Sequence, residues 1–311
     1  MRQPIQTLLE TFKKGKQPNN PYTPKFYGVD GFDVYNPSTL FEYKRKTLII
    51  ARVEKRDSEV SKAVYFEKRG NDFYLRDDIP TLDLQDPFIS VIDNDYVVGG
   101  TYVYHDNGRT RWYTKFYKGP DLDNLKPSLD SPDGMKDVRL IQLKDKRIGV
   151  FTRPQGLKGK RGEIGFDIAP SYAHIDKEFI ENAPLFEQFI ESDWGGANQL
   201  MMLDDQTIGV LGHIATFSTG AVRHYYSMTF KVDVTTKKAS PMKLIAQRSN
   251  FNPGPAKRID LVDVLFSGGL VPVNNDKYIL YVGVSDAEIQ TIEIEKPFDI
   301  KWCYNINKKD Y

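Results

Sequence analysis

The chain has 311 residues, of which 40% are hydrophobic, and 43 lysines and arginines balance 42 aspartates and glutamates. That balance lacks the basic excess of a protein that binds nucleic acid. The lone cysteine, Cys303, excludes an internal disulfide and a zinc site made of cysteines.

The first 25 residues are predicted to form an N-terminal extension. Leu8, Leu9 and Phe12 have the spacing of one face of a short helix packed on the domain. Glu10 and Lys13 interrupt the apolar residues, so the segment lacks the core of a signal peptide. No run of 18 apolar residues predicts a membrane span, so we expect no membrane association and a cytoplasmic location.

A weak repeat runs through the rest of the chain. Each copy has a polar or acidic residue, an apolar strand, a polar turn and a second apolar strand, as in a β-hairpin. The copies occupy residues 31–51, 86–101, 137–151, 198–211 and 267–282. Their turns recur every roughly 50 to 70 residues, a spacing expected of propeller blades.

The repeat predicts an all-β fold, a single five-bladed β-propeller over residues 1–311, because radial packing limits exposed sheet edges. A β-sandwich is the alternative. The segment from about residue 170 to 191 breaks the pattern, since its apolar residues have helix-like spacing, and it is predicted to be a helical insertion.

The innermost strands of a propeller converge on a central channel, so residues at the start of each inner strand should meet at one end. Several polar groups around one pocket are the expected layout of a sugar site. Asp86 stands out because Pro87 follows it and fixes the backbone, although Asp-Pro also starts many ordinary turns and strands. The converging residues are Asp33, Asp86, Asp137, Asn198 with Asp193 nearby, and the Gly268–Gly269 pair.

A glycine-rich basic loop covers residues 153–166. Its glycines let backbone N–H groups approach an anion, and Arg153, Lys158 and Arg161 supply charge. A flexible, solvated loop is the alternative. None of the four histidines has metal-ligand spacing, and no serine-hydrolase motif is present, so we expect no metal site.

The motifs at residues 31–36, 85–88, 153–156, 194–199 and 266–270 together resemble the mannosyltransferase/phosphorylase family, glycosyltransferase family 108, over nearly the full chain. That family was long catalogued as a domain of unknown function. The resemblance implies a five-bladed propeller related to the inverting mannoside phosphorylases of glycoside hydrolase family 130. It implies β-1,2-linked manno-oligosaccharides, mannose 1-phosphate and phosphate as partners, with GDP-mannose as the donor of some relatives. The family's catalytic acid is the aspartate of its Asp-Pro motif, here Asp86.

Two sets of candidate residues accompany Asp86, chosen from their chemistry as well as from the resemblance. The sugar-binding candidates are Asp33, Asn36, Asp137, Asp193, Trp194, Asn198 and Gln199. The phosphate-binding candidates are Arg153, Lys158, Arg161, Arg223, His224 and Tyr225. No cofactor is expected, with inorganic phosphate acting as co-substrate.

A phosphorylase needs one acid for the leaving oxygen, whereas an inverting hydrolase also needs a base for water. One Asp-Pro acid beside a basic loop therefore favours phosphorolysis. Asp86 has to be protonated when the bond breaks, and Asp33 or Asp137 is expected to supply the neighbouring charge that favours its protonation. The alternatives are an inverting hydrolase with Asp33 as the base and a non-enzymatic propeller that binds glycans.

Overall fold

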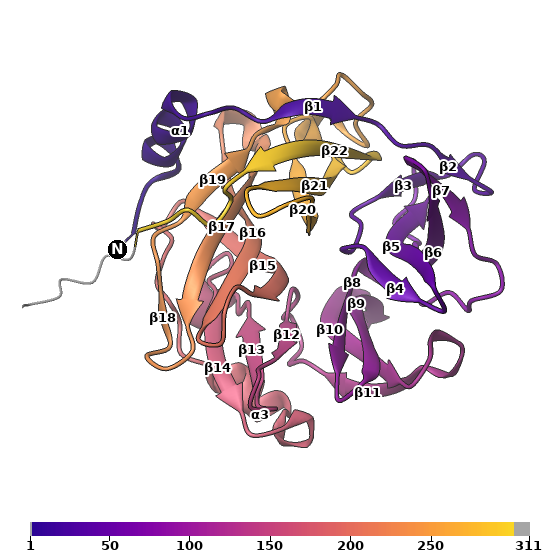
Figure 1. The fold of residues 1–311 in the computed structure, drawn as a ribbon, viewed down its shortest axis with the longest axis horizontal. Helices are drawn as coiled ribbons and strands as arrows, with labels where there is room; N and C mark the ends of the chain where they lie inside the picture. The colour runs from indigo at the N-terminus through magenta and orange to yellow at the C-terminus, as the bar shows by residue number, and fades with distance from the viewer. Residues whose placement is uncertain (1, 302–311) are drawn as a thin grey trace, which may run out of the picture.

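The computed structural model describes residues 2–301. Five sheets follow one another around a centre, and each sheet is one blade (Figure 1). The predicted five-bladed β-propeller with a short N-terminal helix is confirmed. In every blade the inner strand and its neighbour correspond to one of the five hairpins predicted from the sequence repeat.

Within each blade the paired strands follow one another from the centre of the ring to its outer edge, apart from two strands that lie off this path, the second one named in blade 1 and the last one named in blade 4. Blade 1 contains β3 (Asp33–Tyr35), β4 (Phe41–Tyr43), β5 (Lys46–Glu54), β6 (Lys62–Arg69), β7 (Asp72–Leu75) and β2 (Phe26–Tyr27). Blade 2 contains β8 (Gln85–Ile92), β9 (Asp95–Asp106), β10 (Arg109–Gly119) and β11 (Lys126–Asp130). Blade 3 contains β12 (Arg139–Gln142), β13 (Ile148–Thr152) and β14 (Gly165–Ala169). Blade 4 contains β15 (Trp194–Met202), β16 (Thr207–Phe217), β17 (Arg223–Asp233), β18 (Lys238–Ala239) and β19 (Lys243–Ala246). Blade 5 contains β20 (Leu265–Pro272), β21 (Lys277–Val284), β22 (Glu288–Glu295) and β1 (Asn19–Tyr22).

The N-terminal segment closes the ring. Strand β1 pairs antiparallel with β22, with Asn19 opposite Glu293, so the outermost strand of blade 5 comes from the start of the chain (Figure 1). The region predicted as an extension is therefore part of the propeller. Joining the first and last parts of the chain in one sheet removes an exposed edge.

Helix α1 (Ile5–Lys14) precedes this strand and agrees with the predicted N-terminal helix. Its residues Ile5, Leu8 and Phe12 are buried against the apolar cluster between blades 3 and 4. The three residues follow a spacing of three and four, which places them on one helix face.

Local turn chemistry explains the hairpins. Lys44 and Arg45, and likewise Asp93 and Asn94, have positive φ angles of 48°, 64°, 54° and 66°. Two successive left-handed residues form the turn whose twist suits a two-residue hairpin.

The core consists of five apolar clusters, and each lies between two neighbouring blades. Between blades 2 and 3, for example, the rings of Phe88 and Phe116 meet edge to face with centroids 5.6 Å apart, beside Leu140 and Val150. Burial on both faces of each blade explains the continuous apolar runs of the middle strands.

The predicted helical insertion is shorter than expected. Residues 170–191 contain the 3-10 turn η2 (Tyr172–His174) and α3 (Lys177–Asn182), whose N-terminus is capped by the Asp176 side chain. The predicted helical spacing over residues 185–190 is wrong, because that segment is irregular. There, the backbone N–H groups of Gln188 and Phe189 donate to the Glu163 carboxylate instead of to a helix.

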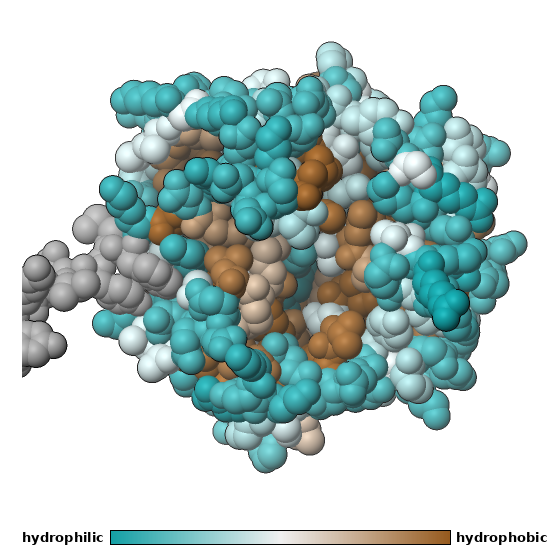
Figure 2. All heavy atoms as spheres, viewed as in Figure 1, coloured by the Kyte–Doolittle hydropathy of each residue, from teal (hydrophilic) through white to brown (hydrophobic). Residues whose placement is uncertain are grey.

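The remaining short helices are α2 (Gly156–Gly159), η1 (Leu122–Asn124), η3 (Thr219–Ala221), η4 (Arg248–Asn250) and η5 (Ile259–Leu261). Across residues 2–301, no helix has the length and apolar character needed to cross a membrane. In the same view as Figure 1, the surface is hollowed near the centre of the ring, and apolar side chains border the hollow (Figure 2).

Candidate active site

A cavity of about 200 Å³ lies at the end of the ring where the inner strands begin. All five blades, with the connections next to them, contribute polar or aromatic side chains to its lining. In blade order these include Asn36, Arg52, Gln85, Asp86, Lys136, Asp137, Arg153, His213, Arg223, Tyr225, Phe266 and Asp286. Of the residues predicted to converge on one pocket, Asp86 and Asp137 line this cavity.

The backbone at this level is irregular, and the irregularity directs side chains into the cavity. Asn36, Asp86, Asp137 and Asp286 all have positive φ angles, of 46°, 50°, 61° and 51°. At Asp86 the register between β8 and β9 shifts between Gln85 and Phe88, as in a β-bulge. Such conformations cost on the order of 1–3 kcal/mol each and cluster at functional sites.

Two carboxyl groups share one amide on one side of the cavity. The Nδ2 atom of Asn36 donates to Asp86 Oδ1 at 2.8 Å and to Asp286 Oδ1 at 3.4 Å. Burial and the charge of Asp86 raise the pKa of Asp286. Asp286 therefore holds a proton more readily than an exposed aspartate would. We call Asn36, Asp86 and Asp286 the carboxylate wall.

A buried ionic network supports this wall. Arg52 Nη1 lies 3.4 Å from Asp86 Oδ1, while its Nη2 lies 2.9 Å from Glu54 Oε2. Glu54 has a fully buried side chain and also contacts the Tyr35 hydroxyl and the Lys257 ammonium. The fixed guanidinium of Arg52 therefore orients the Asp86 carboxylate.

Cations line the opposite side, and we call Lys136, Arg153 and Arg223 the cation wall. The buried Arg139 lies behind the lining, with its Nη2 atom 3.6 Å from Asp137 Oδ1. Arg153 is 2% exposed, and its Nε donates to Gly195 O at 2.7 Å. Its Nη1 lies 3.5 Å from Asp137 but lacks a hydrogen bond of good geometry. Burial acts to raise the pKa of Asp137, but Arg153 and Arg139 outweigh it and hold that pKa below its usual range.

His213 lines the cavity as a neutral ring. It is 1% exposed, and its Nδ1 lies 2.9 Å from Asn198 Oδ1, which fits a ring that donates from Nδ1. Burial, with a further contribution from Arg153, lowers the pKa of His213 to about 3. Tyr225 stacks on the ring at 5.4 Å between centroids.

The predicted sugar-binding residues separate into two groups. Asn36 and Asp137 line the cavity beside Asp86, whereas the others do not. Asp33 instead pairs with Arg56, whose Nη2 donates to Asp33 Oδ1 at 2.7 Å. The carboxyl next to Asp86 is therefore that of Asp286, in place of the expected Asp33.

The other four candidates support the site from outside the cavity. Asp193 accepts from the backbone N–H of Ile5 and so anchors α1. Trp194 Nε1 donates to the Tyr225 hydroxyl at 3.2 Å. Asn198 orients His213, and Gln199 joins blade 4 to the backbone N–H of Leu270 in blade 5.

The predicted phosphate-binding residues also separate. Arg153, Arg223 and Tyr225 line the cavity. Lys158 donates to the carbonyl oxygens of Glu181 and Ala183, away from the cavity lining.

The remaining two phosphate candidates lie next to the cavity lining without being part of it. The Arg161 guanidinium lies over the Phe217 ring at 5.0 Å. His224 Nδ1 lies 2.5 Å from Asp263 Oδ2.

The glycine-rich loop does not form the expected anion cradle. Its backbone amides bond internally, with Gly156 and Lys160 exchanging two hydrogen bonds and Gly162 N donating to Gly159 O. Only Arg153, at its start, reaches the cavity. Likewise, Gly268 and Gly269 do not line the cavity: a Cβ atom on either would lie 2.5 Å from the backbone of Pro37 or Thr39, so they allow blades 5 and 1 to meet.

Sequence reasoning missed Asp286, Arg52, Arg139, Lys136 and His213. Asp286 lies in the β21–β22 turn, and Arg52 lies near the end of β5. Both positions reach the same edge as the start of the inner strands, because adjacent antiparallel strands run in opposite directions. The acidic residue in the turn between β21 and β22 was the sequence feature that could have indicated Asp286.

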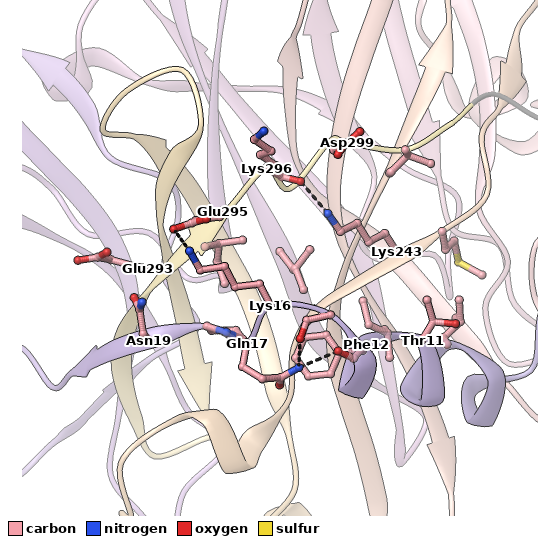
Figure 3. A pocket seen from close by; sticks show the side chains of 18 residues that line it. Thr11, Phe12, Lys16, Gln17, Asn19, Lys243, Glu293, Glu295, Lys296 and Asp299 are labelled. Carbon is pink, nitrogen blue, oxygen red and sulfur yellow. Dashed lines mark hydrogen bonds and ion pairs between the residues drawn. The ribbon is translucent and has the colours of Figure 1, made fainter.

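A larger hollow of about 580 Å³ lies away from this chemistry, between α1, β19 and β22. Its charges are engaged: Lys16 pairs with Glu295 at 2.7 Å, and Lys243 donates to Lys296 O at 2.7 Å (Figure 3). In the part of the chain that the structure describes, no group of three His, Cys, Asp or Glu residues could hold a metal ion.

Comparison with known proteins identifies the family of the chain. The model of a family described as "Protein of unknown function (DUF1861)" matches residues 10–300. The chain belongs to this family. A search of curated protein sequences gives no match.

Solved structures similar to this DUF1861 chain include two from Leishmania mexicana. MPT-4, described as a mannose phosphorylase in complex with phosphate ion, is 34% identical with a TM-score of 0.88, covering 94% of this chain and 93% of its own. MPT-1, described as a GDP-Man-dependent mannosyltransferase, is 28% identical with a TM-score of 0.87, covering 96% and 97%. A β-1,2-mannobiose phosphorylase from Listeria innocua, at 13% identity and a TM-score of 0.62 over 86% and 91%, shows the fold alone.

Proposed function

We propose that this protein is a mannoside phosphorylase or mannosyltransferase that works with inversion. It transfers mannose reversibly between mannose 1-phosphate and β-1,2-linked manno-oligosaccharides. The observation that carries the proposal is the polarity of the cavity, in which a carboxylate wall faces a cation wall. The titles of MPT-4 and MPT-1 support mannose as the transferred sugar and phosphate as its partner.

In the phosphorolysis direction, phosphate held by the cation wall attacks the anomeric carbon of the terminal mannose. The bond from that carbon to the glycosidic oxygen breaks, and Asp86 gives its proton to the departing oxygen. The β-mannoside thus yields α-mannose 1-phosphate and a shortened oligosaccharide. Phosphate arrives as an anionic nucleophile, so the step needs no base.

Residues of the cation wall serve as phosphate ligands in this scheme. The buried Arg153 has an Nη1 atom without a well-formed hydrogen bond, and guanidinium groups bind phosphate oxygens with two parallel donors. The donor is mannose 1-phosphate, with GDP-mannose as the alternative. We predict that the reaction needs no cofactor besides phosphate. We also predict a cytoplasmic location.

Asp86→Asn tests the acid. We expect phosphorolysis of β-1,2-mannobiose to fall by about 10²–10⁴-fold, since that is the usual contribution of general acid catalysis. Asp33→Asn is the matched control, because Asp33 pairs with Arg56 outside the cavity lining. Near-normal turnover in Asp86→Asn would refute the assignment.

Arg153→Ala and the half-buried Arg223→Ala test the phosphate site. We expect the KM for phosphate to rise by about tenfold or more, as charge-assisted hydrogen bonds are worth about 1.5–3 kcal/mol. The KM for the oligosaccharide should change far less. Lys158→Ala is the control, since its ammonium donates to carbonyl oxygens elsewhere. Equal rises in both KM values would contradict the assignment.

An inverting hydrolase is the second candidate, because the cavity lining contains further carboxyl groups besides that of Asp86, those of Asp137 and Asp286. In that case Asp137, which lies beside Arg153 on the other side of the cavity from Asp86, would be the base, in place of Asp33. Mannobiose cleavage with and without phosphate separates the two, and cleavage to free mannose without phosphate would favour the hydrolase.

A further inference from the structure

The size of the cavity limits how much of an oligosaccharide it can enclose. Its volume of about 200 Å³ is below the range of about 300–1,000 Å³ for pockets that bury drug-sized ligands. The cavity therefore has room for little more than one sugar ring beside an anion. The other sugar units of a longer substrate have to lie outside it.

The proposed mechanism, on which this inference rests, also determines the direction in which the outer sugar units extend from the cavity. Inversion requires the attacking phosphate and the departing oxygen to lie on opposite sides of the transferred sugar. Phosphate is assigned to the cation wall of blades 3 and 4. The departing oligosaccharide then extends from the side of Asp86, which belongs to blade 2.

The hairpin β9–β10 of blade 2 projects beyond the start of its inner strand on that side. Gln85, which lines the cavity, is opposite Thr101 in β9, and β8 ends its pairing there. From Tyr102 to Asp106, β9 pairs with β10 and no longer with β8. Five residues of overhang correspond to about 17 Å of strand at the usual rise.

One face of the overhang carries three tyrosines, Tyr102, Tyr104 and Tyr113, which we call the tyrosine face. Tyr102 and Tyr113 are opposite each other across the two strands, and Tyr104 is two residues from Tyr102 on the same face. Their ring centroids lie 5.4 Å, 5.8 Å and 6.3 Å apart, and all three side chains are half-exposed. Lys115 Nζ lies 5.0 Å from the Tyr102 ring.

Tyr102 connects the tyrosine face with the segment before Asp86. Tyr102 packs against the apolar cluster between blades 1 and 2, which includes Leu84. Leu84 precedes Gln85 and Asp86, so the face begins beside the segment that leads to the proposed acid. Tyrosine rings with polar tips offer an apolar surface and hydrogen bonds together, as sugar rings require.

The overhang is held in place by contacts within the chain. Arg111 Nη1 lies 2.6 Å from Asp133 Oδ2, and the Tyr104 hydroxyl donates to Asp133 Oδ1 at 3.0 Å. The Trp112 indole N–H donates to Gly134 O at 3.1 Å. The connection from β11 to β12 thus fixes the hairpin, and a surface that is already ordered binds with a smaller entropic cost.

We propose that the tyrosine face is a subsite for the sugar units of the oligosaccharide that lie outside the cavity, on the side of the departing oxygen. It makes the enzyme prefer substrates longer than mannobiose.

Tyr104→Ala and Tyr113→Ala test this, whereas Tyr102 is spared because it also packs in the core. We expect kcat/KM for β-1,2-mannotetraose to fall by about threefold to tenfold, the size of one aromatic contact. The value for β-1,2-mannobiose and the KM for phosphate should change by less than about twofold on the same argument. Tyr113→Phe should retain most of the activity on mannotetraose.

Tyr27→Ala is the matched control, because Tyr27 is 41% exposed and stacks on Tyr74 at 4.7 Å at the outer edge of blade 1. Equal losses on both substrates, or no loss on mannotetraose, would overturn the proposal, provided that melting temperatures are unchanged. Calorimetric binding of mannotetraose to the intact protein makes the test independent of turnover. If wild type binds mannotetraose but does not cleave it, weaker binding by Tyr104→Ala sustains the subsite while the proposed reaction fails. Absence of binding to wild type refutes the subsite.

Discussion

Replacing His213 by glutamine should remove a large part of the acid sensitivity of the fold. The ring is 1% exposed and lies beside Arg153, Lys136 and Arg139, whose charges oppose its protonation. Glutamine retains an N–H donor that can reach Asn198 Oδ1, so the variant removes titration more than it removes packing.

The magnitude follows from the shift in pKa. The unfolded ring takes up a proton below pH 6.5, whereas the folded ring does so only near pH 3. Between these values the unfolded chain binds more protons, so the free energy of unfolding decreases as the pH falls. At 1.36 kcal/mol per pKa unit, the loss is about 2 kcal/mol between pH 6.5 and pH 5, and on the order of 4 kcal/mol by pH 3. For a domain of this size, about 2 kcal/mol corresponds to roughly 4 °C in Tm.

Two measurements check this prediction. Thermal unfolding followed by circular dichroism at pH 7 and pH 5 should show a larger loss of Tm in wild type than in His213→Gln. NMR titration is direct, because the chain has only four histidines, His105, His174, His213 and His224. A His213 signal that titrates near pH 6.5, or Tm values that fall in parallel for both proteins, would refute the reasoning.

Three further predictions concern stability. Glu54→Gln should lower the free energy of unfolding by about 3–5 kcal/mol, because it breaks a buried ionic network. Glu59→Gln removes a 63% exposed partner of the same cations and should lower it by less than about 1 kcal/mol. Equal changes in Tm for the two variants would contradict the burial argument. Asp286→Asn should raise Tm at pH 7, because the raised pKa of Asp286 means that its charge destabilises the fold. The gain in Tm should vanish as the pH falls from that raised pKa to about 3.9, the pKa of an aspartate in the unfolded chain. A gain in Tm that does not depend on pH would contradict this. Deleting residues up to 22 should expose the edge of β22 and promote association at high protein concentration, as light scattering would detect; an unchanged, monodisperse protein would contradict that role for β1.

The sequence predicted most of the scaffold because its signals are local. Turn residues such as Asp93 and Asn94 tolerate left-handed conformations, and the apolar runs around them have strand length. Hairpins of this kind form within about twenty residues, so their number predicts the number of blades. Closure of the ring by β1 was not predicted, because the residue pattern of neither segment indicates that the two ends of the chain pair with each other.

The same division applies to the site. The Asp-Pro pair marked Asp86 as a candidate, and the start of an inner strand placed it at the cavity, so its position followed from sequence alone. The loop containing Lys158 attracted the same attention, but its glycines serve internal hydrogen bonds. Composition cannot distinguish a loop whose backbone N–H groups bind an anion from a loop whose N–H groups donate to its own carbonyl oxygens.

The sequence by itself thus determined the hairpins, the ring of five blades and the place of Asp86. Only the tertiary structure decided that Asp286 shares an amide with Asp86, that Asp33 does not, and that His213 stays neutral. Local backbone preferences are encoded over a few residues, whereas the charge and burial around a side chain depend on blades 50 to 250 positions away.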